Sequence, residues 1–277
     1  MDCRIDCTNI FTRIAVFPVI TGGTRILWEL TNQFRDPTPH FIQLQVGMTL
    51  DPNATDWTNV GSPVADVSSL IDSEKRAFGS QNWTSYRLIL STTDGTYTSQ
   101  PFTAWGYLSR GDFRIAREIM RQERLVANRW WQEGAVLPRL RSGTPCSGVD
   151  PQTGDCARPS CTECLDTGFV GGYFNPMYCV PANLEPESTG PRQDLGGRGS
   201  TADIAVPARL VGASWLFEKD VWVSLRTARR YSVDYIKNVA AIRGTPIIDE
   251  VTLNFIPFSD AVYCIPVEGL HGLCEHH

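Results

Sequence analysis

Five of the nine cysteines fall in one stretch, CSGVDPQTGDCARPSCTECLDTGFVGGYFNPMYC, which is also rich in glycine and proline. Cys161 and Cys164 form a C-x2-C pair, a spacing that lets two thiolates bind one tetrahedral ion while backbone amides donate to the sulfurs. Cys146 and Cys156 lie upstream, on either side of the turn-forming sequence DPQTG. We therefore predict a metal site made of Cys146, Cys156, Cys161 and Cys164, with Cys179 as a substitute ligand.

The predicted ion is zinc, because soft thiolate ligands select it over harder cations. The segment has few large apolar side chains before Phe169, so it cannot bury enough surface to stay ordered alone. Zinc binding contributes about 10–16 kcal/mol in small zinc-finger peptides, which is enough to order such a loop. Four thiolates leave no open coordination position, so the predicted site is structural and not catalytic.

Two other states of these cysteines stay open at this point. A double C-x2-C would be a stronger pattern, and Val149 stands where Cys146 would need its partner. Reduced surface thiols and disulfides are therefore alternatives to a metal. Outside the stretch, Cys264 in the strand-like VYCIPV is expected to be a packed thiol. No role is assigned to the residues near the two ends: Cys3, Cys7, Cys274, His276 and His277.

The bulk composition limits the classes of function. The chain has 277 residues, 42% of them hydrophobic, and a formal net charge of -5, so its overall charge does not favour a polyanion as partner. No run of 18 or more apolar residues occurs, and the first residues carry charges where a signal peptide needs an apolar core. We therefore expect no membrane partner and a reducing compartment, where clustered cysteines more often bind metal than form disulfides.

The elements that must position these residues are mainly β and fall into several domains. Residues 1–107 contain apolar runs at 13–20, 24–30, 40–48 and 85–92, separated by turn sequences, and Asp94-Gly95 predicts a hairpin. This region resembles a fibronectin type III or immunoglobulin-like β-sandwich. In that resemblance, Trp28 belongs to the core and Tyr86 makes the corner hydrogen bond.

Residues 108–182 are expected to hold an Arg-rich helix followed by the cysteine knuckle. Asp112 can cap a helix over about 112–133, and an apolar stripe recurs at helical spacing. The arginines are expected either to form a solvated face with i,i+4 ion pairs or to contact an acidic protein surface or DNA. Trp130 and Trp131 are expected to be core or interface anchors. The stripe is Ile115, Ile119, Val126 and Trp130, and the arginines are Arg114, Arg117, Arg121 and Arg124.

The rest of the chain divides into a linker and a second β-rich region. Residues 183–203 are dominated by Pro, Gly, Ser and charge, which predicts a flexible linker or extended loop. Residues 204–277 are expected to form a small antiparallel β-barrel with a C-terminal tail. Its predicted strands lie at about 202–210, 220–227, 229–242, 245–257 and 260–267.

Taken in order, these parts resemble structural proteins of the neck or head–tail connector of tailed-bacteriophage virions. The resemblance extends over about residues 110–267 and depends most on the knuckle from Cys146 to Pro176. It also includes Arg229 to Val233, Gly244 to Ile247 and Asp260 to Pro266. The family pattern has paired C-x2-C halves, so Val149 departs from it and Cys156 becomes the replacement ligand.

The resemblance implies a subunit of a homo-oligomeric ring of six or twelve copies, located in the virion and assembled in the host cytoplasm. Its implied partners are the portal, adaptor or tail components, with passive contact to genomic DNA where the ring lines a channel. Closed rings use heterologous contacts, so two different faces of each subunit would meet.

We expect no enzymatic activity, because no Ser/His/Asp or Cys/His arrangement has a plausible context and no phosphate-binding glycine motif precedes a helix. Two binding functions compete with the virion hypothesis. CTECLDTG resembles one unit of a peptide-binding C-x2-C-x-G-x-G zinc repeat of redox or chaperone-type modules, but only one unit occurs. A zinc-knuckle module that binds nucleic acid or protein outside a virion is the second alternative, and it predicts salt-dependent DNA binding.

Overall fold

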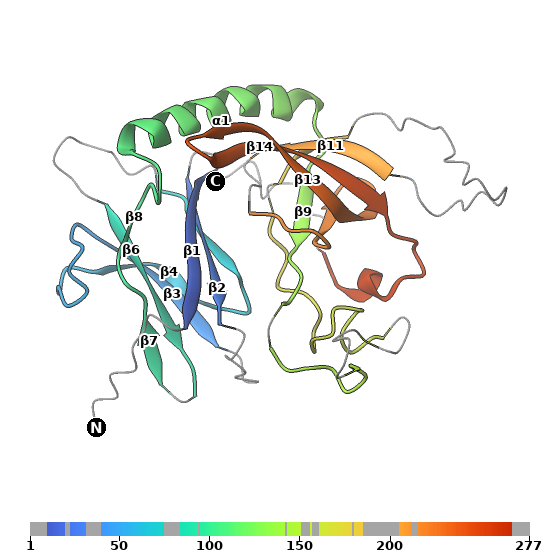
Figure 1. The fold of residues 1–277 in the computed structure, drawn as a ribbon, viewed down its shortest axis with the longest axis horizontal. Coiled ribbons are helices and arrows are strands. Elements are labelled where there is room, and N and C mark those ends of the chain that lie inside the picture. The colour runs from blue at the N-terminus through green and yellow to red at the C-terminus, as the bar shows by residue number, and fades with distance from the viewer. Residues whose placement is uncertain are drawn as a thin grey trace.

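A computed structural model describes residues 10–19, 23–31, 40–74, 84–93, 95–141, 143–150, 156, 161–178, 180–184, 205–211 and 215–267. The fold is mainly β, with antiparallel sheets and one long helix (Figure 1). The expected linker falls almost entirely on residues 185–204, which lie outside the described residues.

The N-terminal region contains two antiparallel sheets. The first has the order β1-β2-β5, formed by Phe11–Pro18, Thr24–Leu30 and Ser69–Asp72. The second has the order β4-β3-β6-β7, with β8 also paired to β6. Its strands are β3 (Phe41–Gly47), β4 (Thr58–Ala65), β6 (Ser85–Ser91), β7 (Thr96–Thr98) and β8 (Phe102–Thr103).

The two sheets enclose one core because apolar residues alternate along their strands. Ile26 and Trp28 on β2 pack in the same buried cluster as Leu44 on β3 and Leu88 on β6. Trp28 is therefore a core residue, as predicted, and the predicted hairpin joins β6 to β7. The hydroxyl of Tyr86 does not make the expected corner bond to the backbone. It donates instead to the buried carboxylate of Asp72 at 2.6 Å.

The second region is one six-stranded antiparallel sheet with the order β10-β11-β14-β13-β12-β9. Gln132 and Ala182 exchange two backbone hydrogen bonds of 2.9 Å, and the amide of Val180 donates to the carbonyl of Gly134. The chain entering β10 therefore also bonds to the chain entering β9, at the other edge of the sheet. Its strands are β9 (Gly134–Leu137), β10 (Ala182–Leu184), β11 (Ala205–Val211), β12 (Val221–Ser224), β13 (Arg230–Ile242) and β14 (Thr245–Phe255).

The cysteine segment is an insertion between two strands of this sheet. β9 precedes it and β10 follows it, so a domain boundary at residue 204 would separate both strands from their hydrogen-bonded partners. Close packing fixes the start of β9: a Cβ on Gly134 would lie 2.4 Å from the ring of Trp222. The indole of Trp222 in turn donates to the carbonyl of Val180, just before β10.

The two regions share buried surface. Ala15, Phe17 and Leu27 on the first sheet belong to the same core cluster as Trp215 and Trp222 of the second region. The first sheet is therefore covered on both faces, by the second N-terminal sheet and by the C-terminal region.

Helix α1 (Arg110–Trp130) lies over β13 and β14 at one end of the molecule (Figure 1). Its N-cap is Ser109, whose hydroxyl accepts from the amide of Asp112, so the predicted cap position was wrong by three residues. The predicted apolar stripe was wrong at three of its four positions: Ile115, Val126 and Trp130 are 56%, 49% and 80% exposed, and Ile119 alone packs against the buried cluster. The stripe that packs on Ile247 and Ile248 is Phe113, Ala116, Met120 and Ala127.

The last predicted strand is a short 3-10 helix, η2 (Ala261–Cys264). The side chain of Asp260 accepts from the amide of Val262, which caps the helix in place of strand pairing. Cys264 is exposed and is not the packed thiol that we expected. None of the helices in the described ranges combines the length and the apolar character needed to cross a bilayer.

Candidate metal centre

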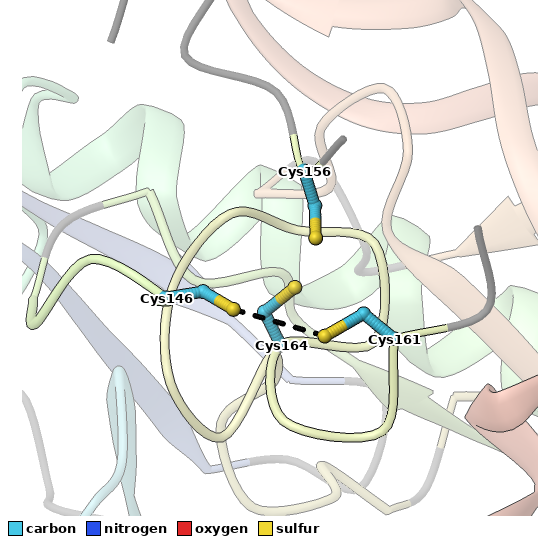
Figure 2. A group of neighbouring side chains, drawn as sticks. All are labelled: Cys146, Cys156, Cys161 and Cys164. Carbon is cyan, nitrogen blue, oxygen red and sulfur yellow. Dashed lines mark hydrogen bonds between the residues drawn. The ribbon is translucent and has the colours of Figure 1, made fainter. Parts of the chain in front are cut away.

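The structure brings the four predicted cysteines together (Figure 2). The sulfur atoms of Cys146, Cys156, Cys161 and Cys164 all lie within 4.8 Å of one another. Cys146, Cys161 and Cys164 are buried, and Cys156 is half-buried. Cys156 therefore takes the place that the missing partner at Val149 leaves open, and the group could hold a metal ion.

The spacing of the sulfurs suits tetrahedral zinc. The Cys146 and Cys161 sulfurs lie 3.7 Å apart. A tetrahedral ion with metal–sulfur bonds of about 2.3 Å separates its ligands by about 3.8 Å. An ion could therefore bind between these two sulfurs with little change in their separation.

The C-x2-C turn prepares one thiol for ionisation. The backbone amides of Cys164 and Glu163 hydrogen-bond the Cys161 sulfur and lower its pKa to about 7. At Cys146 the Gly148 amide lowers the pKa, but burial, the Glu163 carboxylate and the neighbouring thiols raise it to about 12. Cys161 is thus the first thiolate available, and Cys146 needs the positive charge of an ion to lose its proton.

Two chain segments form the centre and are joined by backbone hydrogen bonds. The amide of Cys146 donates to Gly168 at 2.9 Å, and the amide of Val170 donates to Thr144 at 2.9 Å. Within the second segment, the hydroxyl of Thr167 donates to the carbonyl of Cys164 at 2.6 Å. These bonds place Cys146 opposite the C-x2-C pair, although many residues separate them in the sequence.

The chain reverses direction after Cys164 through residues whose backbone adopts the left-handed conformation, with positive φ. Leu165 and Asp166 have φ of 50° and 61°, and Gly172 has φ of 71°. A Cβ on Gly172 would lie 2.7 Å from the carbonyl oxygen of Cys164. Gly172 is therefore needed both for its backbone conformation and for its close approach to the backbone of Cys164.

Sequence reasoning missed two residues that contact the centre or its turn. Glu163 accepts from Ser147 at 2.8 Å and lies 3.3 Å from the Cys146 sulfur. The guanidinium of Arg139 donates to the carbonyls of Asp166 and Thr167. Glu163 lies inside the C-x2-C pair, so its position could have been noticed, whereas Arg139 is positioned by tertiary structure alone.

The other predicted residues do not join the cluster or cannot be placed. Cys264 lies on η2, away from it. The substitute ligand Cys179 lies outside the described residues, as do Cys3, Cys7, Cys274, His276 and His277. On α1, Arg121 makes a two-bond contact with Glu118, and Arg243 pairs with Asp112. Among the arginines predicted on this helix, Arg121 therefore forms the kind of exposed ion pair expected of a solvated face.

No known protein family, curated protein or solved structure matches the chain.

Proposed function

We propose that the four cysteines hold one structural zinc ion. The observation that carries this proposal is the convergence of four sulfurs, three of them buried, on one point inside an insertion of the β-sheet. All four coordination positions would be occupied by sulfur, so the ion would have no position for a substrate. Its role would be to fix the segment between β9 and β10.

We further propose that the protein is a non-enzymatic subunit of the neck or head–tail connector of a tailed bacteriophage. The sequence resemblance over residues 110–267 supports this role, together with an Ig- or fibronectin III-like sandwich and a small barrel as its domains. Two packed sheets around Trp28 are in keeping with the sandwich. The bonds that join Gln132 to Ala182 at the start of β10, and Gly134 to Val180 just before it, are in keeping with a closed barrel.

The metal proposal is tested by elemental analysis of the purified protein and of two Cys→Ser variants. We expect one zinc per chain in the unmodified protein and in Cys264→Ser, whose thiol is exposed on η2. Cys164→Ser removes a fully buried ligand and should reduce the bound zinc to a small fraction. Equal zinc contents in the two variants would refute the site.

The virion proposal is tested by imaging the protein alone and with purified portal or tail components. Rings with six- or twelve-fold symmetry, or addition of the protein to one end of the portal, are expected. A protein that stays monomeric and binds neither component would refute the proposal. Retention on DNA that falls steeply with salt, without ring formation, would favour the alternative nucleic-acid-binding module.

A further inference from the structure

Helix α1 carries a row of apolar side chains that stay largely exposed. The row consists of Ile115, Ile119, Val126 and Trp130, and we call it the exposed stripe. Trp130 is the most exposed of the four, at 80%, and Ile119 is half-buried. The helix lies along one end of the molecule with its sheet on one side, so the stripe is open to a partner (Figure 1).

The exposed stripe is straight, because Ile115 and Val126 are eleven residues apart, close to three whole turns. It is about 22 Å long, since an α-helix rises about 1.5 Å per residue. At about 100° per residue, its members fall within about 60° of the helix circumference, and their centre lies about 100° from the stripe that packs on the sheet. The exposed stripe is therefore on the side of α1, where a second helix can lie along it.

The spacing of the exposed stripe is the same in both directions. Its members are separated by four, seven and four residues. If two copies of α1 lie antiparallel, Ile115 is opposite the partner's Trp130, and Ile119 is opposite the partner's Val126. Every member of the stripe is then matched, and the largest side chain meets a branched aliphatic one. A twofold contact needs a surface that is complementary to itself, and this spacing meets that condition.

The charges beside the exposed stripe have the same symmetry. Glu118 and Arg129 lie on one side of it, about 70–90° from its centre, as the residues flanking the contact between two paired helices do. In the antiparallel pair, Glu118 is within about 3 Å along the axis of the partner's Arg129. Opposite charges therefore meet at both ends, whereas a parallel pair would place like charges side by side. Glu118 also binds Arg121 on its own helix at 2.7 Å, and the two oxygens of its carboxylate can accept from both arginines.

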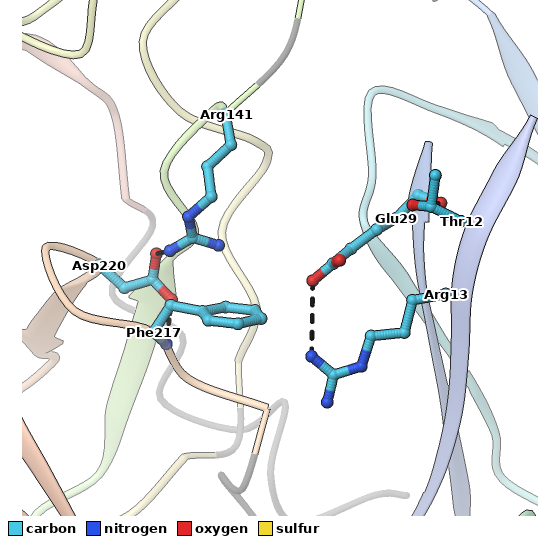
Figure 3. Close-up of polar contacts among 6 residues, drawn as sticks. All are labelled: Thr12, Arg13, Glu29, Arg141, Phe217 and Asp220. Atoms are coloured by element: carbon cyan, nitrogen blue, oxygen red, sulfur yellow. Dashed lines mark hydrogen bonds and ion pairs between the residues drawn. The ribbon is translucent and has the colours of Figure 1, made fainter. Parts of the chain in front are cut away.

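Arg129 is available for such a contact. Other exposed arginines already have an acid within the chain: Arg141 contacts Asp220 at 3.1 Å, and Arg13 lies 3.7 Å from Glu29 (Figure 3). Arg129 is exposed in the last turn of α1 and has no ion pair within the ranges that the structure describes. A second copy would supply the missing acid.

The area of the exposed stripe sets the strength of the contact. Trp130 offers at most about 250 Å², and the other three members are smaller and less exposed. The stripe therefore buries less than the about 800 Å² per partner of a standard stable interface. We expect a dimer that forms at submillimolar concentration and dissociates at low micromolar concentration, where the stability of the single chain does not depend on this contact.

We propose that two copies of this chain associate through their α1 helices, which lie antiparallel about a twofold axis between positions 122 and 123. Such a contact uses the same surface on both copies and stops at two, whereas ring contacts join two different faces and continue. The proposal therefore depends neither on the virion role nor on the metal.

The test is sedimentation equilibrium of the full chain from low micromolar to submillimolar concentration, with two alanine variants of α1. Trp130→Ala should weaken the dimer at least about tenfold, because the dimer loses this aromatic side chain twice. Leu125→Ala is the matched control and should change nothing: Leu125 is 61% exposed but points about 110° away from the centre of the exposed stripe. A monomer at every concentration, or equal affinities in the two variants, would overturn the proposal.

Charge reversal tests the antiparallel direction. Arg129→Glu alone and Glu118→Arg alone should each weaken the dimer about threefold or more, since like charges then meet at both ends. The double variant brings opposite charges together again and should recover most of the affinity. If it does not, the antiparallel pairing is wrong. Binding to vesicles of phosphatidylcholine and phosphatidylglycerol without dimerisation would assign the exposed stripe to a membrane surface and would also overturn the proposal.

Discussion

The guanidinium of Arg139 donates a hydrogen bond to the backbone carbonyl of Thr167 at 3.2 Å, and so connects the sheet to the turn that follows the C-x2-C pair. A second bond of 3.1 Å runs from the same group to the carbonyl of Asp166. The backbone amide of Arg139 donates to the buried Asp220 carboxylate at 2.9 Å. Arg139, which lies two residues after the end of β9, thus fixes the turn of the C-x2-C pair relative to the start of β12.

This arrangement predicts that Arg139→Gln releases the ion more easily. Outer contacts that orient a metal site change its affinity by about 10–100-fold, and we expect the lower end because Arg139 holds the turn and no ligand directly. The measurement is the rate of zinc transfer to a colorimetric chelator, which should rise about tenfold. Arg121→Gln, an exposed arginine on α1, is the control. Equal transfer rates would show that the turn holds its shape without Arg139.

The two neighbouring glycines of the returning chain should differ in their tolerance of alanine. Gly171 and Gly172 both have positive φ, so either substitution costs about 1–2 kcal/mol of backbone strain. A Cβ on Gly171 meets only Leu140 at 3.9 Å, whereas one on Gly172 meets the Cys164 carbonyl at 2.7 Å. We expect Gly171→Ala to keep its zinc and Gly172→Ala to lose most of it on dialysis against a chelator. If both variants retain zinc equally, the close contact at Gly172 does not control the site.

The convergence of the four cysteines could be predicted from the sequence because few thiols were available and their order restricts which can meet. Cys156 has no motif of its own, and it was singled out by the DPQTG turn that separates it from Cys146 and by the absence of a cysteine at position 149. The surroundings of the site could not be predicted in this way. The membership of β9 and β10 in one sheet depends on pairings between residues far apart in the chain, which a local pattern does not encode.

The strand predicted at 85–92 was confirmed as β6, where Tyr86, Leu88 and Leu90 are buried and the residues between them are less so, which leaves a clear period of two. The helix stripe was not confirmed, because α1 carries two apolar stripes at helical spacing. The predicted stripe is exposed at Ile115, Val126 and Trp130, whereas the buried stripe combines Phe113 and Met120 with the small residues Ala116 and Ala127. Small residues allow the helix to lie close to β13 and β14, and this preference is visible only once the partner surface is known.

The choice between the two helix stripes is open to direct measurement. Met120→Ala removes a 1% exposed side chain and should lower the free energy of unfolding by about 2–4 kcal/mol. Ile115→Ala removes a side chain that is 56% exposed and should change it by less than about 1 kcal/mol. Denaturant titration of both variants checks this. A larger loss in Ile115→Ala would mean that a partner copy covers the exposed stripe.

Asp249 should make the protein less stable at neutral pH. It lies on β14, is 1% exposed, and its Oδ1 has no hydrogen-bond partner within the part of the chain that the structure describes. Burial raises its pKa from 3.8 to about 6. The folded state therefore binds this proton more tightly than the unfolded state, so the stability contributed by Asp249 is complete below about pH 4 and is lost as the pH rises through about 6.

Asp249→Asn removes this charge and should stabilise the protein at pH 7 by up to about 3 kcal/mol, the equivalent of a shift of about two pKa units. The gain should shrink as the pH falls and should vanish near pH 4, where the carboxyl is protonated in both states. Denaturant titrations of both proteins from pH 4 to pH 7.5 measure the difference between their free energies of unfolding. The second buried acid, Asp220, also has a raised pKa, but its contribution cancels in this difference because both proteins contain it. A difference that does not change with pH would show that the carboxylate has a partner that compensates its charge.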